Sequence, residues 1–133
     1  MPHAHTTHEL AACIEACLAC SRECRQTALT HCLPLGGAHV EPDHFRLMFD
    51  CVTACDAAAA LMAGGSPYHP AYCALCAEVC RACAASCDAL ADMDDCARAC
   101  RDCAAQCDAM ALHDMHPEPR RGGRGAERPR RTS

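Results

Sequence analysis

The sequence predicts an all-α protein: an antiparallel up-down-up-down four-helix bundle with a cysteine-lined lumen. Sixteen of the 133 residues are cysteine, and fifteen of them recur at spacings of three and four. Each residue of an α-helix turns about 100° around the axis, so such offsets return to nearly the same face. Four such segments, separated by short stretches rich in proline and glycine, fit an antiparallel bundle with the cysteines facing inward.

The fifteen in-register cysteines fall into four groups, one for each expected helix. They are Cys13, Cys17, Cys20 and Cys24; Cys51 and Cys55; Cys73, Cys76, Cys80, Cys83 and Cys87; and Cys96, Cys100, Cys103 and Cys107. Cys32 stands apart from this pattern. Alanine or valine would fill the same volume without reactive thiols, so the stripe is interpreted as a chemical feature rather than as ordinary core.

The first helix is expected from about residue 6 to residue 30. Thr6 and Glu9 have the spacing of a capping box, in which each side chain bonds the other residue's backbone amide. Residues 33–42, LPLGGAHVEP, are predicted to form a loop because they contain two prolines and two adjacent glycines.

The remaining three helices are bounded by similar signals. The second should run from Pro42, a favourable first-turn residue, to residue 63, where Gly64 and Gly65 end it. The third is expected over residues 70–91. The fourth should start after residue 92 and end before Pro117.

The chain divides into a bundle domain, residues 1–116, and a basic tail, residues 117–133. The tail holds six Arg and two Glu, so the bundle domain carries a charge of −9 within a total of −5. We expect the tail to be disordered because it has little apolar surface to bury. An acidic bundle argues against nucleic acid as a partner.

No apolar run reaches membrane-spanning length, and the N-terminus lacks the basic and apolar regions of a secretory signal. We therefore expect no membrane partner and a cytoplasmic protein. Thiols stay reduced in that compartment, so a cysteine array there is typical of metal binding or redox chemistry rather than of a disulfide framework.

The spacing favours Cu(I) among the metals. Iron–sulfur clusters usually take cysteines from loops, and zinc requires closed tetrahedral sites. Cu(I) is selected by thiolate and thioether ligands. If each ion takes two thiolates and each thiolate bridges two ions, a fully used array holds on the order of 16 Cu(I) per chain. Each Cu(I) replaces one thiol proton, so the filled lumen stays close to neutral.

In-phase cysteines on all four expected helices resemble those of the bacterial cytosolic copper storage proteins, over about residues 8–116. The resemblance implies a homotetramer of bundles, each filled with Cu(I) that is held mostly by thiolates. It also implies a role in sequestering copper and protecting against its toxicity. The second helix departs from the pattern, because it carries only two cysteines.

Softer ligands extend the stripes at both ends of the predicted bundle. His44 and Met48 precede Cys51, and we expect them at one end with His31 and Met93; His113 follows Cys107 at the other end. The resemblance implies that such residues capture an ion and pass it inward. The resemblance favours the His44 end as the entry port.

Two other functions remain open on the sequence alone. A zinc or general metal buffer, similar to metallothionein, would bind about four Zn²⁺ per chain at roughly four thiolates each. A redox thiol reservoir would form reversible disulfides without a strong metal preference. An enzyme is not expected, because neither a phosphate-binding glycine loop nor a recognisable nucleophilic set is present in the sequence.

Overall fold

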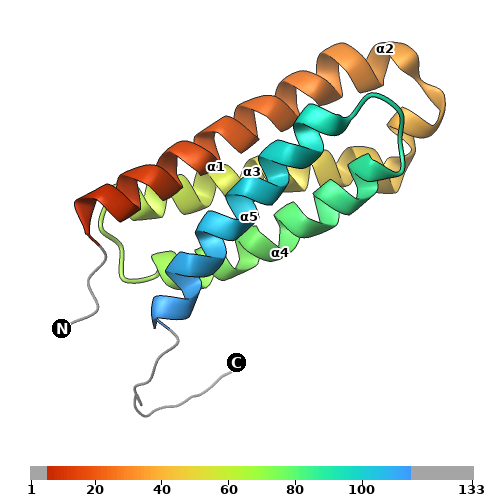
Figure 1. The fold of residues 1–133 in the computed structure, drawn as a ribbon. Helices are drawn as coiled ribbons and strands as arrows, with labels where there is room; N and C mark the ends of the chain where they lie inside the picture. The colour runs from red at the N-terminus through yellow and green to blue at the C-terminus, as the bar shows by residue number, and fades with distance from the viewer. Residues whose placement is uncertain (1–5, 115–133) are drawn as a thin grey trace, which may run out of the picture.

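The computed structural model describes residues 6–114, with side chains as far as residue 111. Within this range four long helices form the bundle: α1 (Thr7–Thr27), α3 (Pro42–Ala63), α4 (His69–Asp88) and α5 (Asp94–Asp114). Helix α1 packs against α3 and α5, and α4 packs against the same two helices (Figure 1). The predicted all-α, antiparallel four-helix bundle is confirmed.

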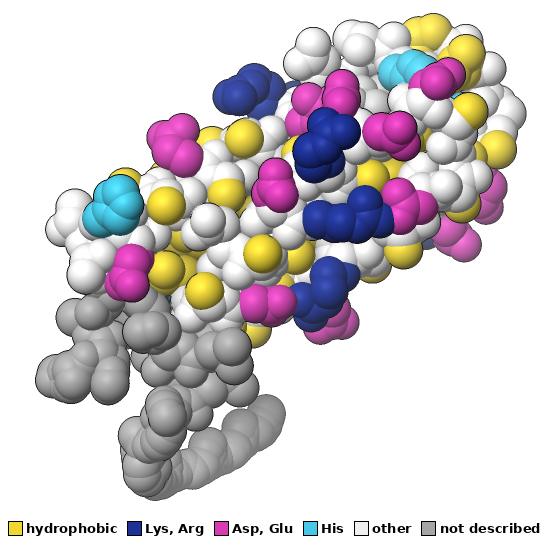
Figure 2. Space-filling view, viewed as in Figure 1, with side chains coloured by type: hydrophobic (Ala, Val, Ile, Leu, Met, Phe, Trp, Pro, Cys, Tyr) yellow, Lys and Arg dark blue, Asp and Glu magenta, His cyan; other side chains and the backbone are white. Residues whose placement is uncertain are grey.

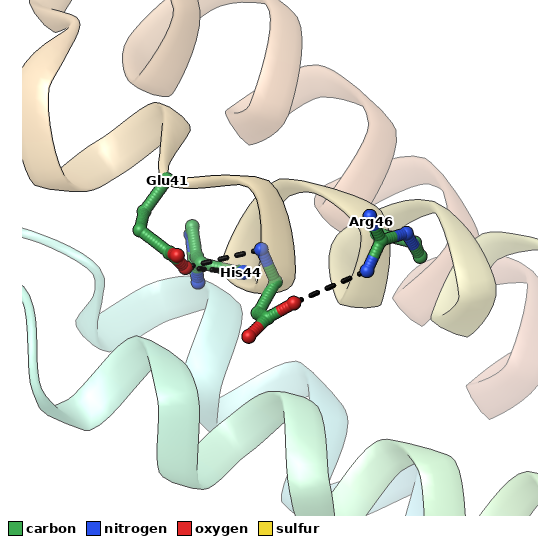
Figure 3. A network of polar contacts seen from close by, with 4 residues as sticks. Glu41, His44 and Arg46 are labelled. Atoms are coloured by element: carbon green, nitrogen blue, oxygen red, sulfur yellow. Dashed lines mark hydrogen bonds and ion pairs between the residues drawn. The ribbon is translucent and has the colours of Figure 1, made fainter.

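Acidic side chains help to cap the N-termini of α1 and α3. The Thr6 hydroxyl oxygen accepts a hydrogen bond from the Glu9 backbone N–H at 2.9 Å, and the Glu9 carboxylate accepts one from the Thr6 N–H at 2.9 Å. At α3, the Glu41 carboxylate accepts hydrogen bonds from the N–H groups of Asp43 and His44 (Figure 3). These bonds satisfy amides that have no partner inside the helix.

The first helix continues past residue 30, which corrects the expected loop at 33–42. A π-helical turn, η1 (Ala28–Cys32), follows α1 directly and leads into a short helix, α2 (Leu33–Leu35); a 3₁₀ turn, η2 (Gly37–Val40), completes the connection. Pro34 is tolerated because it stands in the first turn of α2, where a backbone N–H would have no partner within that helix. The chain turns only at Gly36, whose φ is 68° and ψ −157°.

The π turn also corrects the expectation that Cys32 stands apart. In an unbroken α-helix Cys32 would point about 80° away from Cys24, because it is eight residues further on. The extra residue in the π turn absorbs this rotation. Cys24, Ala28 and Cys32 are all fully buried, so Cys32 joins the stripe of the first helix.

The outer surface carries interleaved acidic and arginine side chains (Figure 2). Arg25 pairs with Asp56 across α1 and α3 at 3.3 Å, and Arg81 pairs with Asp108 across α4 and α5 at 2.7 Å. Such exposed pairs contribute little stability individually. Among the described helices, none is both long enough and apolar enough to cross a membrane.

We predict that Gly36→Ala destabilises the metal-free protein by about 1–3 kcal/mol, because the backbone conformation at Gly36 is nearly exclusive to glycine. Urea unfolding under reducing conditions measures this change. Gly64→Ala is the matched control: its φ is −86°, and an added Cβ would meet only the Ala60 carbonyl oxygen, at 3.5 Å. Equal destabilisation by the two substitutions would contradict the assignment of strain to Gly36.

Candidate metal centre

Thiols form the interior of the bundle. All sixteen cysteines are free and buried, and none exposes more than 1% of its surface. The other buried residues are mainly alanine and methionine, whereas larger side chains such as Phe45 and Phe49 are only partly buried and pack against this core. The lumen, defined as the space between the cysteine Sγ atoms, therefore occupies the place where a bundle normally packs leucine and isoleucine.

Four groups of cysteines bring their Sγ atoms within 4.8 Å of one another. They are Cys13, Cys73 and Cys107; Cys17, Cys76, Cys103 and Cys107; Cys20, Cys55, Cys80 and Cys103; and Cys20, Cys24, Cys51 and Cys100. Consecutive groups share a member: Cys107, then Cys103, then Cys20. The groups therefore form one continuous ladder along the bundle rather than separate sites.

Individual Sγ–Sγ distances in the ladder range from 3.5 Å between Cys17 and Cys107 to 4.0 Å between Cys20 and Cys24. A disulfide requires about 2.05 Å between sulfurs, so these residues are thiols in contact. Many of the contacts join different helices, as between Cys24 and Cys96 at 3.6 Å. A metal ion can therefore bridge helices.

Within the described residues, the buried polar side chains are those of Ser21 and His44, so carboxylates and ammonium groups are absent from the lumen. Thiol contacts consequently dominate its electrostatics. Hydrogen bonding, most of all with Cys100, lowers the pKa of Cys51. Hydrogen bonding, most of all with Cys103, raises the pKa of Cys80, although the Cys80 sulfur is only 3.6 Å from the Cys51 sulfur. Neighbouring thiols of the ladder therefore differ in acidity, and an entering cation can displace their protons.

Met48 lies among thiols at the end of the bundle that α2 and the α4–α5 connection close, called here the α2 end. Its Sδ is 3.7 Å from the Sγ atoms of both Cys83 and Cys87, and 4.0 Å from that of Cys96. These three cysteines continue the ladder beyond Cys24, because Cys96 contacts Cys24. Met48 thus adds a thioether to the lumen itself.

His44 also lies at the α2 end, where it is 5% exposed. Its Nδ1 is 2.7 Å from the Ser86 hydroxyl oxygen, and its Nε2 is 3.8 Å from Cys32 Sγ. Burial lowers the pKa of His44, which favours the neutral imidazole that binds metals. Cys32 and Ser86 were not among the candidate site residues, and for Ser86 the sequence offers no signal.

His31 is turned out of the stripe by the π turn. Its ring packs edge-on against His39, with 5.2 Å between ring centroids, and its Nε2 is buried without a hydrogen-bond partner in the described part of the chain. His31 lines a cavity of ≈ 310 Å³ that also reaches Met93 and Cys96. His113 lies in the last turn of α5, outside the residues whose side chains are described.

This arrangement defines a class of protein: a helical bundle that stores many soft metal ions in a thiol-lined interior. The model of the copper storage protein family matches residues 6–112. A cysteine-rich protein of Bacillus subtilis, uncharacterized YhjQ, is 40% identical over 76 residues, which cover 57% of this chain and 69% of that protein.

Solved structures agree with this match. A crystal structure from Nitrosospira multiformis has a TM-score of 0.79 at 47% identity, covering 80% of this chain and 98% of that one. The Cu(I)-bound copper storage protein BsCsp3 has a TM-score of 0.71 at 37% identity, covering 77% and 98%. A cytosolic copper storage protein of Streptomyces lividans, solved with five coppers, has a TM-score of 0.67 at 30% identity, covering 79% and 93%.

The chain belongs to the copper storage protein family. The predicted function, copper storage through cysteines in a four-helix bundle, is confirmed, and its role is storage rather than catalysis.

We predict that Cys80→Ser combined with Cys103→Ser lowers the Cu(I) capacity, by about two ions per chain if each thiolate accounts for about one ion. Far-UV circular dichroism should remain helical, since serine keeps nearly the same volume. Ala58→Ser, which adds a hydroxyl at a buried position without removing a thiol, should leave capacity unchanged. An unfolded double variant with undiminished stoichiometry would contradict a metal-binding lumen.

Proposed function

We propose that this protein is a cytosolic Cu(I) store that binds on the order of 16 ions per chain, about one per thiol, and so protects the cell from free copper. The observation that carries the proposal is the sharing of Cys20, Cys103 and Cys107 between consecutive thiol groups. A shared thiolate bridges two ions, and bridging lets two- or three-coordinate Cu(I) fill the whole ladder. Isolated four-thiolate sites would suit zinc better.

The proposed thiolate ligands are the fifteen cysteines of the predicted stripe. Met48, His44 and His113 are proposed as additional ligands of softer or neutral character at the bundle ends. The contacts of Met48 with Cys83 and Cys87 support its part. The proposal for His113 rests on its place in the last turn of α5, beyond the final cysteine of that helix.

A cytosolic location is proposed by analogy with the relative in Streptomyces lividans, which is a cytosolic copper storage protein. A reducing compartment would keep the sixteen thiols free, as Cu(I) binding requires.

The test is an anaerobic Cu(I) titration of the reduced protein against a chromogenic chelator. We expect a plateau well above ten ions per chain, because the ladder runs without interruption along the lumen. A plateau at zero to four ions would count against the proposal. Zinc titration and disulfide mapping would then separate a zinc buffer, with about four Zn²⁺ per chain, from a redox reservoir.

We also propose that the bundles assemble as a homotetramer, as the family resemblance implies. Support comes from an apolar groove of ≈ 290 Å³ between α3 and α4, lined by Ala54, Ala57, Tyr72, Leu75 and Val79 among others. Tyr72 is 44% exposed and Leu75 50% exposed. Large apolar side chains gathered on one outer face are typical of protein–protein interfaces.

Leu75→Arg is predicted to shift the protein toward smaller species in analytical ultracentrifugation, because a charge in the groove opposes burial against another copy. Cu(I) capacity per chain should stay the same, since the lumen is enclosed within one bundle. Gln106→Arg places the same charge at an exposed position of α5 and serves as the control. If both variants keep the wild-type mass, the groove is not the interface.

A further inference from the structure

One cysteine of the lumen also forms part of the wall of an outer cavity. Cys96 lines the ≈ 310 Å³ cavity between α1 and the start of α5. It is 1% exposed, whereas the other fifteen cysteines are 0% exposed. The same cavity is lined by the exposed residues Gln26, Thr30 and Asp92, so it opens to solvent. Cys96 is therefore the thiol of the array that a small molecule in this cavity meets first.

The charge of the cavity limits which oxidants can approach Cys96. Glu23, Asp92 and Asp95 line it. Asp95 is paired with Arg98 at 3.0 Å, so the negative charge comes mainly from the other two carboxylates. Carboxylates repel anions, which include the disulfides of acidic peptides. Hydrogen peroxide is small and neutral, so this charge does not hold it back.

A second thiol lies beside Cys96. The Sγ atom of Cys24, on α1, is 3.6 Å from the Sγ atom of Cys96. A disulfide needs about 2.05 Å between its sulfurs, so the two must approach by about 1.5 Å, a distance that side-chain rotation can cover. Thiols that respond to peroxide commonly combine an accessible cysteine with a neighbouring cysteine that resolves the first product. Cys96 and Cys24 stand in this relation.

We propose that Cys96 and Cys24 form a dithiol that hydrogen peroxide oxidises in the copper-free protein. The Cys96 thiol loses its proton, and the thiolate attacks one peroxide oxygen. The O–O bond breaks, and the leaving hydroxide takes up the proton as water, which leaves a sulfenic acid on Cys96. The Cys24 sulfur then forms the S–S bond as the S–O bond breaks, and its proton leaves with the hydroxide as a second water. Two thiols are oxidised, and one peroxide is reduced to two waters.

This oxidation removes two ligands from the array next to the cavity. Cys24 belongs to the thiol group that also contains Cys20, Cys51 and Cys100. A sulfur in a disulfide has no proton to exchange for Cu(I), so the oxidised protein binds less copper. In a reducing compartment the bond is transient, because thiol reductants open it again. The effect on copper rests on the proposed function, whereas formation of the disulfide does not.

The experiment adds one equivalent of hydrogen peroxide to the reduced, copper-free protein under anaerobic conditions. The remaining thiols are then alkylated in denaturant, and disulfides are mapped by mass spectrometry. Cys24–Cys96 should be the first disulfide. Cys96→Ser should slow the first oxidation about tenfold, because reactivity follows access to the thiol. Ala97→Ser introduces the same side chain at the next buried residue of α5 and keeps all sixteen thiols, so it should oxidise like wild type.

Met93 is the competing target, because its side chain lines the same cavity. Its oxidation adds one oxygen atom to the protein, whereas the disulfide removes two hydrogen atoms, so the intact mass separates the two reactions. An oxygen added at Met93 without a disulfide would overturn the dithiol. A different first disulfide, or oxidation of Cys96→Ser at the wild-type rate, would overturn it as well.

Anaerobic Cu(I) titration of the oxidised protein tests the effect on storage. Its plateau should fall by about two ions per chain relative to the reduced protein, and a dithiol reductant should restore it. An unchanged plateau in protein with a mapped Cys24–Cys96 disulfide would overturn the loss of copper ligands. A plateau of zero to four ions in the reduced protein would instead overturn storage, while the disulfide map still decides whether the dithiol exists.

Discussion

The structure depends on thiol–thiol contact in an interior where none of the described side chains carries a charge. Sulfurs 3.5–4.0 Å apart replace the leucine and isoleucine packing that usually stabilises a bundle. Cysteine is a small hydrophobe, so the metal-free chain can fold around it. The same atoms become ligands once protons leave, and each Cu(I) that enters keeps the lumen neutral. Folding and storage therefore use one set of side chains.

Other features follow from this constraint. A core of cysteine and alanine is thin, so Phe45, Phe49 and Leu47 pack at its flanks rather than inside it. Charge is kept on the outer surface, where arginine–aspartate pairs join neighbouring helices. Metal ions that bridge helices would stabilise the folded protein further as more of them bind, because ligand binding to the folded state stabilises that state.

The two ends of the lumen differ in donor chemistry. At one end the ladder finishes in three thiols, Cys13, Cys73 and Cys107. At the α2 end it passes through Met48 to a mixed cluster of thiol, imidazole and thioether. Thioether and neutral imidazole bind Cu(I) without losing a proton, whereas a thiol must release one.

The sequence by itself determined the bundle, its antiparallel order and the stripe of fifteen cysteines, because helical periodicity is local and spacing of three and four leaves no other regular structure. Only the tertiary structure decided how the stripes share sulfurs, as Cys20 does between two groups. It also decided the places of Cys32 and His31. Helical spacing predicted that His31 lies in the stripe and Cys32 outside it. The π turn reverses these two positions, so that Cys32 faces the lumen. In that turn Cys32 contacts His44 of α3 and Met93, which precedes α5, and such long-range contacts cannot be read from the local sequence.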